Sequence, residues 1–181
     1  MASLKPEDIL TDKFAALLRE DETSRNAFMR VFVGTRVEGL KPQCISRRER
    51  PPGKADILVE GENGPFYYVE AKLTQEIQPL QLIRARSYMR QYGQNKKPEN
   101  FVLSLSCERH SVTHSGWPTD NVVRNVRFST WTEAKREMLA ARPQLGKNRA
   151  WRTFWKTAGE MGALVERPTL RDLASKKWTV V

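Results

Sequence analysis

Hydrophobic residues near the N-terminus recur at the spacing of an α-helix. Pro6 and the acids Glu7 and Asp8 are typical of a first helical turn. The hydrophobic positions that follow are Ile9, Leu10, Phe14, Leu17 and Leu18. They fit one face of a helix. The polar run 20–25 interrupts the pattern, and the hydrophobic residues at 28, 31 and 32 predict a second short helix that ends at Gly34.

Five short runs predict β-strands. They cover Leu40–Ser46, Ala55–Val59, Phe66–Leu73, Phe101–Leu105 and Val122–Phe128. Pro42 places the first of them at a sheet edge, because proline has no N–H to donate to a central ladder. The turn formers of residues 61–65 separate the second run from the third, so these two runs predict a β-hairpin.

Three further segments have helical patterns. In residues 77–91 the side chains expected to face the core are Leu80, Ile83, Tyr88 and Met89. Thr130 and Glu133 have the spacing of a capping box, which predicts a helix that runs to about Arg142. A last helix is predicted for residues 150–158. The order of helices and strands indicates an α/β (α+β) sandwich around a mixed central sheet flanked by helices.

Chemically reactive side chains gather on the predicted hairpin. Strand alternation puts Glu70 and Lys72 on one face, roughly 7 Å apart. If the turn is centred on Asn63, antiparallel partners have numbers that sum to twice 63, which is 126, and Asp56 then lies opposite Glu70. A tighter Asn-Gly turn would shift this register. The first register is favoured because it gathers the hydrophobic residues on the opposite face.

Two facing carboxylates beside a lysine are the groups that metal-assisted phosphodiester cleavage requires. Asp56 and Glu70 repel each other, and a divalent cation converts that repulsion into binding. Mg²⁺ prefers oxygen ligands and commonly uses one or two carboxylates together with water and phosphate oxygens. Lys72 is placed to orient or deprotonate a water and to offset negative charge. The alternative explanation is a surface hairpin with a Glu-x-Lys ion pair.

The stretch GKADILVEGENGPFYYVEAKL resembles the core of the PD-(D/E)XK nuclease superfamily, whose fold is also called restriction-endonuclease-like. The resemblance covers about residues 5–110 and implies an αβββαβ core. It implies that Asp56 is the motif aspartate and that Glu70-Ala71-Lys72 is the (D/E)-x-K triplet. The carbonyl of Ala71 would then join the metal shell. Ala55 stands where the family usually has proline.

The resemblance also implies two helper residues. Members of the superfamily often carry an acid on the first helix that points to the metal. Glu7 is the favoured candidate, and the others are Asp8, Asp12 and Glu20. Many members place a glutamine on the helix after the lysine strand. Gln81 matches best and Gln78 next, although a solvated helix glutamine explains this position equally well.

The net charge of +10, with a pI near 9.9, predicts a polyanionic partner, most simply DNA. Residues 134–181 carry eleven Lys and Arg against four acids, a surplus of +7. The residues expected to bind nucleic acid are Arg47, Arg48, Arg50, Lys54, Lys147, Arg149 and Arg152. Trp151, Trp155 and Trp178 lie among basic residues and suit base stacking. Docking of the helical tryptophans on the core is the favoured interpretation, because Trp151 and Trp155 share a helix face.

Cysteine content and hydropathy predict where in the cell the protein is located. Cys44 and Cys107 are too few and too far apart for a disulfide framework, which favours a cytoplasmic location. No hydrophobic run is long enough for a bilayer, and the first residues lack a signal-peptide pattern, so we expect no membrane association. Cys107, His110 and His114, with Cys44, have zinc-type chemistry, but polar loop histidines are the favoured explanation.

The sequence therefore predicts a Mg²⁺- or Mn²⁺-dependent endodeoxyribonuclease. Residues 1–130 would form the nuclease-like core, and residues 131–181 a basic helical C-terminal extension packed on it as part of one domain. A homodimer or a larger defence or repair complex is a further expectation. The alternative from another class is a non-catalytic nucleic-acid-binding module or accessory subunit that retains the fold.

Overall fold

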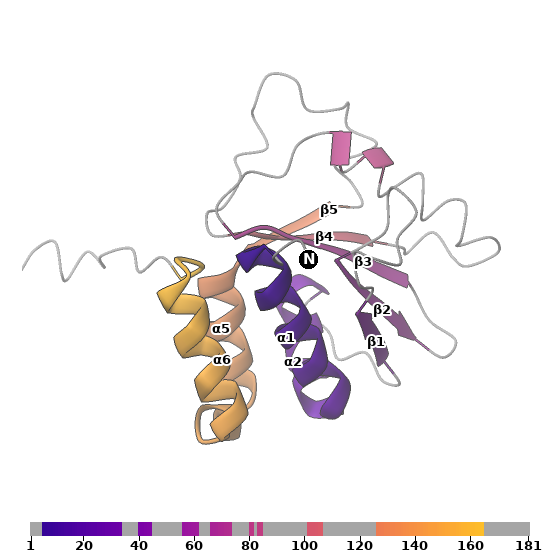
Figure 1. Cartoon of the computed structure of the whole chain (residues 1–181). Helices are drawn as coiled ribbons and strands as arrows, with labels where there is room; N and C mark the ends of the chain where they lie inside the picture. The colour runs from indigo at the N-terminus through magenta and orange to yellow at the C-terminus, as the bar shows by residue number, and fades with distance from the viewer. Residues whose placement is uncertain are drawn as a thin grey trace, which may run out of the picture.

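The computed structural model consists of one sheet with the N-terminal and C-terminal helices packed on one of its faces (Figure 1). It describes residues 5–33, 40–44, 56–61, 66–73, 80–81, 83–84, 101–106 and 126–164. Helices and strands follow each other in the mixed order expected of an α+β protein. The α+β class and the mixed sheet predicted from the sequence are therefore confirmed.

The sheet has five strands in sequence order. They are β1 (Leu40–Cys44), β2 (Ile57–Gly61), β3 (Phe66–Ala71), β4 (Phe101–Ser106) and β5 (Val126–Thr130). The pairs β1–β2 and β2–β3 are antiparallel, whereas β3–β4 and β4–β5 are parallel. Strand β1, which contains Pro42, lies at an edge, as predicted. Strand β3 lies at the centre, where neighbours on both sides hold its backbone in place.

The β2–β3 hairpin has the predicted register. Leu58 pairs with Tyr68 and Ile57 with Val69, so the partner numbers sum to 126. The contact continues past β2, because the N–H of Asp56 donates to the carbonyl of Val69 at 3.0 Å. Alternation puts Ile57 and Val69 in the main hydrophobic core. Asp56, Leu58 and Tyr68 therefore lie on the other face, where they too are buried.

Two N-terminal helices cover the sheet, and a single residue separates them along the chain. Helix α1 spans Pro6–Glu20 and α2 spans Glu22–Val33. Asp21 lies between them, and its carboxylate accepts from the N–H groups of Thr23 and Ser24 and from the Ser24 hydroxyl. These bonds satisfy donors that the first turn of α2 leaves open. Asp21 therefore explains why the hydrophobic pattern is interrupted at residues 20–25.

The C-terminal helices complete the helical layer. Helix α5 spans Trp131–Ala141, the short 3₁₀ helix η2 spans Pro143–Gly146, and α6 spans Arg149–Glu160. The predicted capping box is present, with Thr130 and Glu133 each accepting from the other's backbone N–H. The predicted boundary at residues 130 and 131 falls between β5 and α5, where the chain passes directly from strand to helix.

Aromatic rings join the N-terminal and C-terminal helices in one core. The ring of Phe14, from α1, lies 5.0 Å from Phe28 and 5.3 Å from Trp131, measured between centroids. It also lies within 6.2 Å of Trp151 and Trp155 in α6. These two tryptophans are only 2% and 5% exposed. Core docking is confirmed, and base stacking is wrong for both; Trp178 lies outside the described residues.

The predicted core contacts of Leu80 and Ile83 are wrong. Their exposed fractions are 62% and 39%. Gln81 instead faces the sheet, where its amide donates to Glu70 at 3.2 Å. Successive residues of a helix are rotated by about 100°, so a helix that presents Gln81 inward turns both hydrophobic neighbours away. The other predicted core residues of this segment, Tyr88 and Met89, lie outside the described residues.

Candidate functional site

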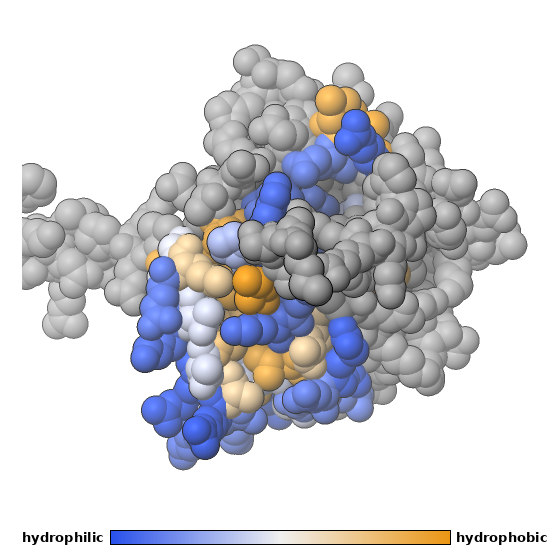
Figure 2. Space-filling view, viewed as in Figure 1, coloured by the Kyte–Doolittle hydropathy of each residue, from blue (hydrophilic) through white to orange (hydrophobic). Residues whose placement is uncertain are grey.

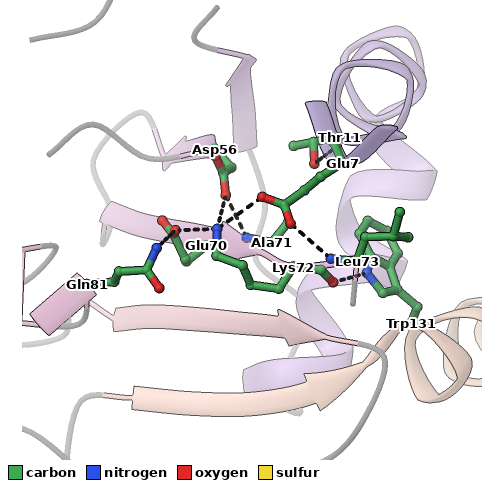
Figure 3. Close-up of polar contacts among 9 residues, drawn as sticks. All are labelled: Glu7, Thr11, Asp56, Glu70, Ala71, Lys72, Leu73, Gln81 and Trp131. Carbon is green, nitrogen blue, oxygen red and sulfur yellow. Dashed lines mark hydrogen bonds and ion pairs between the residues drawn. The ribbon is translucent and has the colours of Figure 1, made fainter. Parts of the chain in front are cut away.

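Three carboxylates from distant parts of the chain surround the ammonium group of Lys72, directly after the end of β3 (Figure 3). The Nζ atom lies 2.9 Å from Oε1 of Glu70, 3.2 Å from Oε1 of Glu7 and 3.9 Å from Oδ2 of Asp56. The structure thus brings together the three residues of the predicted motif and the favoured N-terminal acid.

The sheet positions the two motif carboxylates. Asp56 lies one residue before β2, and its Oδ2 accepts from the backbone N–H of Ala71 at 2.9 Å. Glu70 lies in β3, and the side-chain amide of Gln81 donates to its Oε1. Hydrogen bonds therefore hold both carboxylates at a defined distance from the lysine. Of the two candidate glutamines, Gln81 is at the site, and Gln78 lies outside the described residues.

Glu7 connects the first turn of α1 to the end of the lysine strand. Its Oε1 accepts from the Lys72 ammonium and its Oε2 from the backbone N–H of Leu73, each at 3.2 Å. The other acids considered for this role include Asp12 and Glu20, which are exposed on α1. Because both oxygens of Glu7 bond to the Lys72–Leu73 segment, this carboxylate fixes where the lysine lies.

The cluster is buried, and burial affects the charge state of the lysine. Asp56, Glu70 and Lys72 are 4%, 8% and 6% exposed. Burial by itself lowers the pKa of Lys72, because it disfavours the charged form. Attraction by Glu70 and Asp56, the hydrogen bond with Glu70 and attraction by Glu7 outweigh it. The net pKa of Lys72 lies above its usual 10.5, so the side chain is an ammonium at neutral pH.

Trp131 is a member of the site that the sequence did not reveal. Its indole N–H donates to the backbone carbonyl of Lys72 at 3.0 Å, and the side chain is 1% exposed. Trp131 and Glu7 therefore hold the backbone on both sides of the Lys72–Leu73 peptide bond. The capping box placed Trp131 at the start of a helix, but no local pattern places that helix beside residue 72.

The donor chemistry of the cluster suits a hard divalent cation. The four charged groups, three carboxylates and one ammonium, sum to −2. The described ranges contain no group of three or more Asp, Glu, His or Cys side chains arranged to hold a metal ion. In Figure 3 the Lys72 ammonium lies among the carboxylates of the cluster. Asp56 and Glu70, whose carboxylate oxygens lie 3.9 Å and 2.9 Å from that ammonium, are the pair that could hold a hard cation.

The predicted nucleic-acid contacts fall in two groups. Arg47, Arg48, Arg50 and Lys54 lie outside the described residues, as do the candidate zinc ligands Cys107, His110 and His114. Lys147, Arg149 and Arg152 are exposed around the start of α6. Helix α5 has 11 residues, so this group is separated from the Trp131 end of the helical layer by roughly 16 Å.

Comparisons with known proteins identified no relative of this chain. No family model matches the chain, and neither the curated proteins nor the solved structures searched contain a match. Within the described ranges, no helix is both long enough and hydrophobic enough to cross a membrane. Functional assignment therefore depends on the chemistry of the cluster.

Proposed function

We propose that the chain is a divalent-metal-dependent nuclease with a restriction-endonuclease-like αβββαβ core, and that it hydrolyses DNA phosphodiester bonds. The observation that carries the proposal is the convergence of Asp56 and Glu70 on the ammonium group of Lys72. Asp56 directly precedes β2, whereas Glu70 and Lys72 lie in and directly after β3, the neighbouring strand of the sheet. Burying three carboxylates and an ammonium costs free energy, because these charges lose their hydration. A chemical role therefore accounts for the cluster better than a role in stabilising the fold.

Asp56 and Glu70 would hold Mg²⁺ or Mn²⁺ through their carboxylate oxygens. The N–H of Ala71 donates to Asp56, and the N–H and C=O of one strand residue point to the same side. The carbonyl of Ala71 would therefore supply a third oxygen on the Asp56 side. When bound, the cation would polarise the scissile phosphate and make an attacking water more acidic.

Lys72 would act as a hydrogen-bond donor and a positive charge. Its raised pKa favours the ammonium form, which has no lone pair with which to accept a proton. The ammonium would orient the attacking water and offset the negative charge that develops on the phosphate. Glu7 and Trp131 would hold the lysine at the right position, and Gln81 would orient Glu70.

DNA is the proposed substrate because the chain carries a net charge of +10. Phosphate contacts supply most of the sequence-independent affinity for DNA, and they weaken as salt rises. The second candidate is a non-catalytic nucleic-acid-binding module, which would share the salt-sensitive binding but not the cleavage.

Plasmid, linear duplex and single-stranded DNA, incubated with Mg²⁺, Mn²⁺ or EDTA, test the proposal. Wild-type protein should cut at least one substrate in the presence of metal only. Lys72→Met keeps the length of the side chain and removes the ammonium, so it should abolish cutting. Lys13→Met is the matched control, because it removes an exposed ammonium from α1. Equal cutting by Lys72→Met and wild type would exclude this site, and binding without any cutting would favour the second candidate.

A further inference from the structure

A groove between α5 and α6 is lined by positive charge. It has a volume of about 720 Å³, and its charged lining consists of Lys135 from α5 and Arg149, Arg152 and Lys156 from α6. Among the residues that the structure describes, no acidic side chain lines it. The three cations on α6 follow i, i+3, i+7 spacing, which places them in one row along the helix. Figure 2 shows hydrophilic residues along the outer edge of α6 and at the lower end of the helix pair.

The opposite face of α6 explains why this row is held in place. Trp151, Phe154 and Trp155 are buried against α1 and α5. The helix therefore cannot rotate without exposing three aromatic rings, each of which represents several kcal/mol of burial. The basic row is fixed on a rigid element and does not lie on a loop.

The charges along the groove are poorly compensated by acids. Within the described ranges, Lys156 alone of the four has an acidic partner, Glu160, at 3.7 Å, and both side chains are largely exposed. On α5, Glu137 pairs with Arg136 at 2.9 Å, and neither residue lines the groove. Four like charges along one groove repel each other, and an anionic ligand relieves this repulsion.

The spacing of the row suits the phosphates of nucleic acid. Arg149 and Lys156 are seven residues apart, or roughly 10 Å along the helix axis. One DNA strand presents a phosphate about every 3.4 Å along the duplex axis, so the row spans about three phosphates. Arginine and lysine both bind phosphate oxygens.

We infer that the α5–α6 groove binds the sugar-phosphate backbone of DNA away from the bond that is cut. The inference rests on the proposed nuclease function and adds a second contact to it. Lys135 lies four residues from Trp131, and the groove runs from there toward η2, away from the Lys72 cluster. The groove thus supplies affinity for a distant segment of the substrate, whereas the cluster performs the chemistry.

Binding of a fluorescein-labelled DNA duplex in EDTA, followed by fluorescence anisotropy at several salt concentrations, tests this inference. The groove variant is Arg149→Gln/Arg152→Gln/Lys156→Gln. The control, Lys13→Gln/Arg19→Gln/Arg30→Gln, removes the same charge from exposed positions of α1 and α2. The groove variant should bind at least about tenfold more weakly, with the salt slope reduced by about 2.7 for three lost contacts. The control should stay close to wild type.

Equal weakening by the two variants would overturn the inference, because net charge alone would then explain binding. Loss of binding to phosphatidylserine vesicles with full retention of DNA binding would also overturn it, in favour of a membrane surface. Circular dichroism of both variants checks that they fold. The proposed function fails separately, since Lys72→Met reports on cleavage and the groove variant reports on binding without metal.

Discussion

Two replacements of Asp56 separate the charge of this carboxylate from its hydrogen bond. Asp56→Asn keeps an oxygen that accepts the buried N–H of Ala71, which donates at 2.9 Å in the wild type. It removes the negative charge. Asp56→Ala removes the charge and the acceptor together. The pair therefore tests the chemical role of this side chain against its structural role at one position.

The stability difference between these variants follows from the contacts of Asp56. Its attraction to Lys72, 3.9 Å away, amounts to about 4 kcal/mol at an effective dielectric constant near 20. Repulsion from the Glu70 carboxylate beside the same ammonium opposes it, so Asp56→Asn should change the free energy of unfolding by much less than this attraction. Asp56→Ala additionally leaves the Ala71 N–H without an acceptor, at a further cost of about 1–3 kcal/mol.

Thermal unfolding in EDTA and cleavage in Mg²⁺ measure the two effects. Asp56→Ala should melt several degrees below Asp56→Asn, since 1 kcal/mol shifts Tm by about 2–4 °C in a chain of this size. Both variants should cut DNA at least about 100-fold more slowly. Mutation of a residue that only hydrogen-bonds to a metal ligand already lowers activity by up to about 100-fold, and Asp56 is proposed to be a ligand itself. Wild-type cleavage by Asp56→Asn would refute the metal-ligand role, and equal Tm values would refute the structural role.

Two further predictions concern Lys72 and the tryptophans. The pKa of Lys72 is raised in the folded state, so its stabilisation is fully present below its unfolded pKa of about 10.5 and is lost as pH rises through the higher folded value. Urea unfolding between neutral and strongly alkaline pH should therefore show a loss of stability in the wild type that Lys72→Met lacks; parallel pH profiles would contradict this. Trp131→Phe should be less stable than Trp155→Phe by about 1–3 kcal/mol. The first variant deprives the Lys72 carbonyl of its donor, whereas the second removes a buried N–H that has no acceptor in the described part of the chain. Equal urea midpoints for the two variants would argue against a structural role for the Trp131 hydrogen bond.

Elements that depend on neighbouring residues were predicted well. The break between α1 and α2 and the capping box of α5 involve partners only two or three residues apart. The register of the β2–β3 hairpin followed from its turn and from the alternation of Ile57, Val59 and Val69. These features were accessible because turn geometry, caps and side-chain periodicity act over a few residues.

The orientation of the helical segment around Gln81 was predicted less well. Hydrophobic spacing indicated that Leu80 and Ile83 face the core, yet both are exposed. Periodicity identifies a hydrophobic stripe but not the surface that the stripe meets. In the folded chain the side of the segment that carries Gln81 contacts Glu70 of the sheet.

By itself, the sequence determined the α+β class, the hairpin and the placement of Glu70 and Lys72 on one strand face. Only the tertiary structure decided which first-helix acid reaches Lys72 and that Trp131 supports it, across separations of 65 and 59 residues. The physical reason is that strand pairing and helix caps are local. The contacts of Glu7 and Trp131 arise only when the aromatic core packs α1 and α5 against the sheet. That packing places the first turn of α1 beside the end of β3.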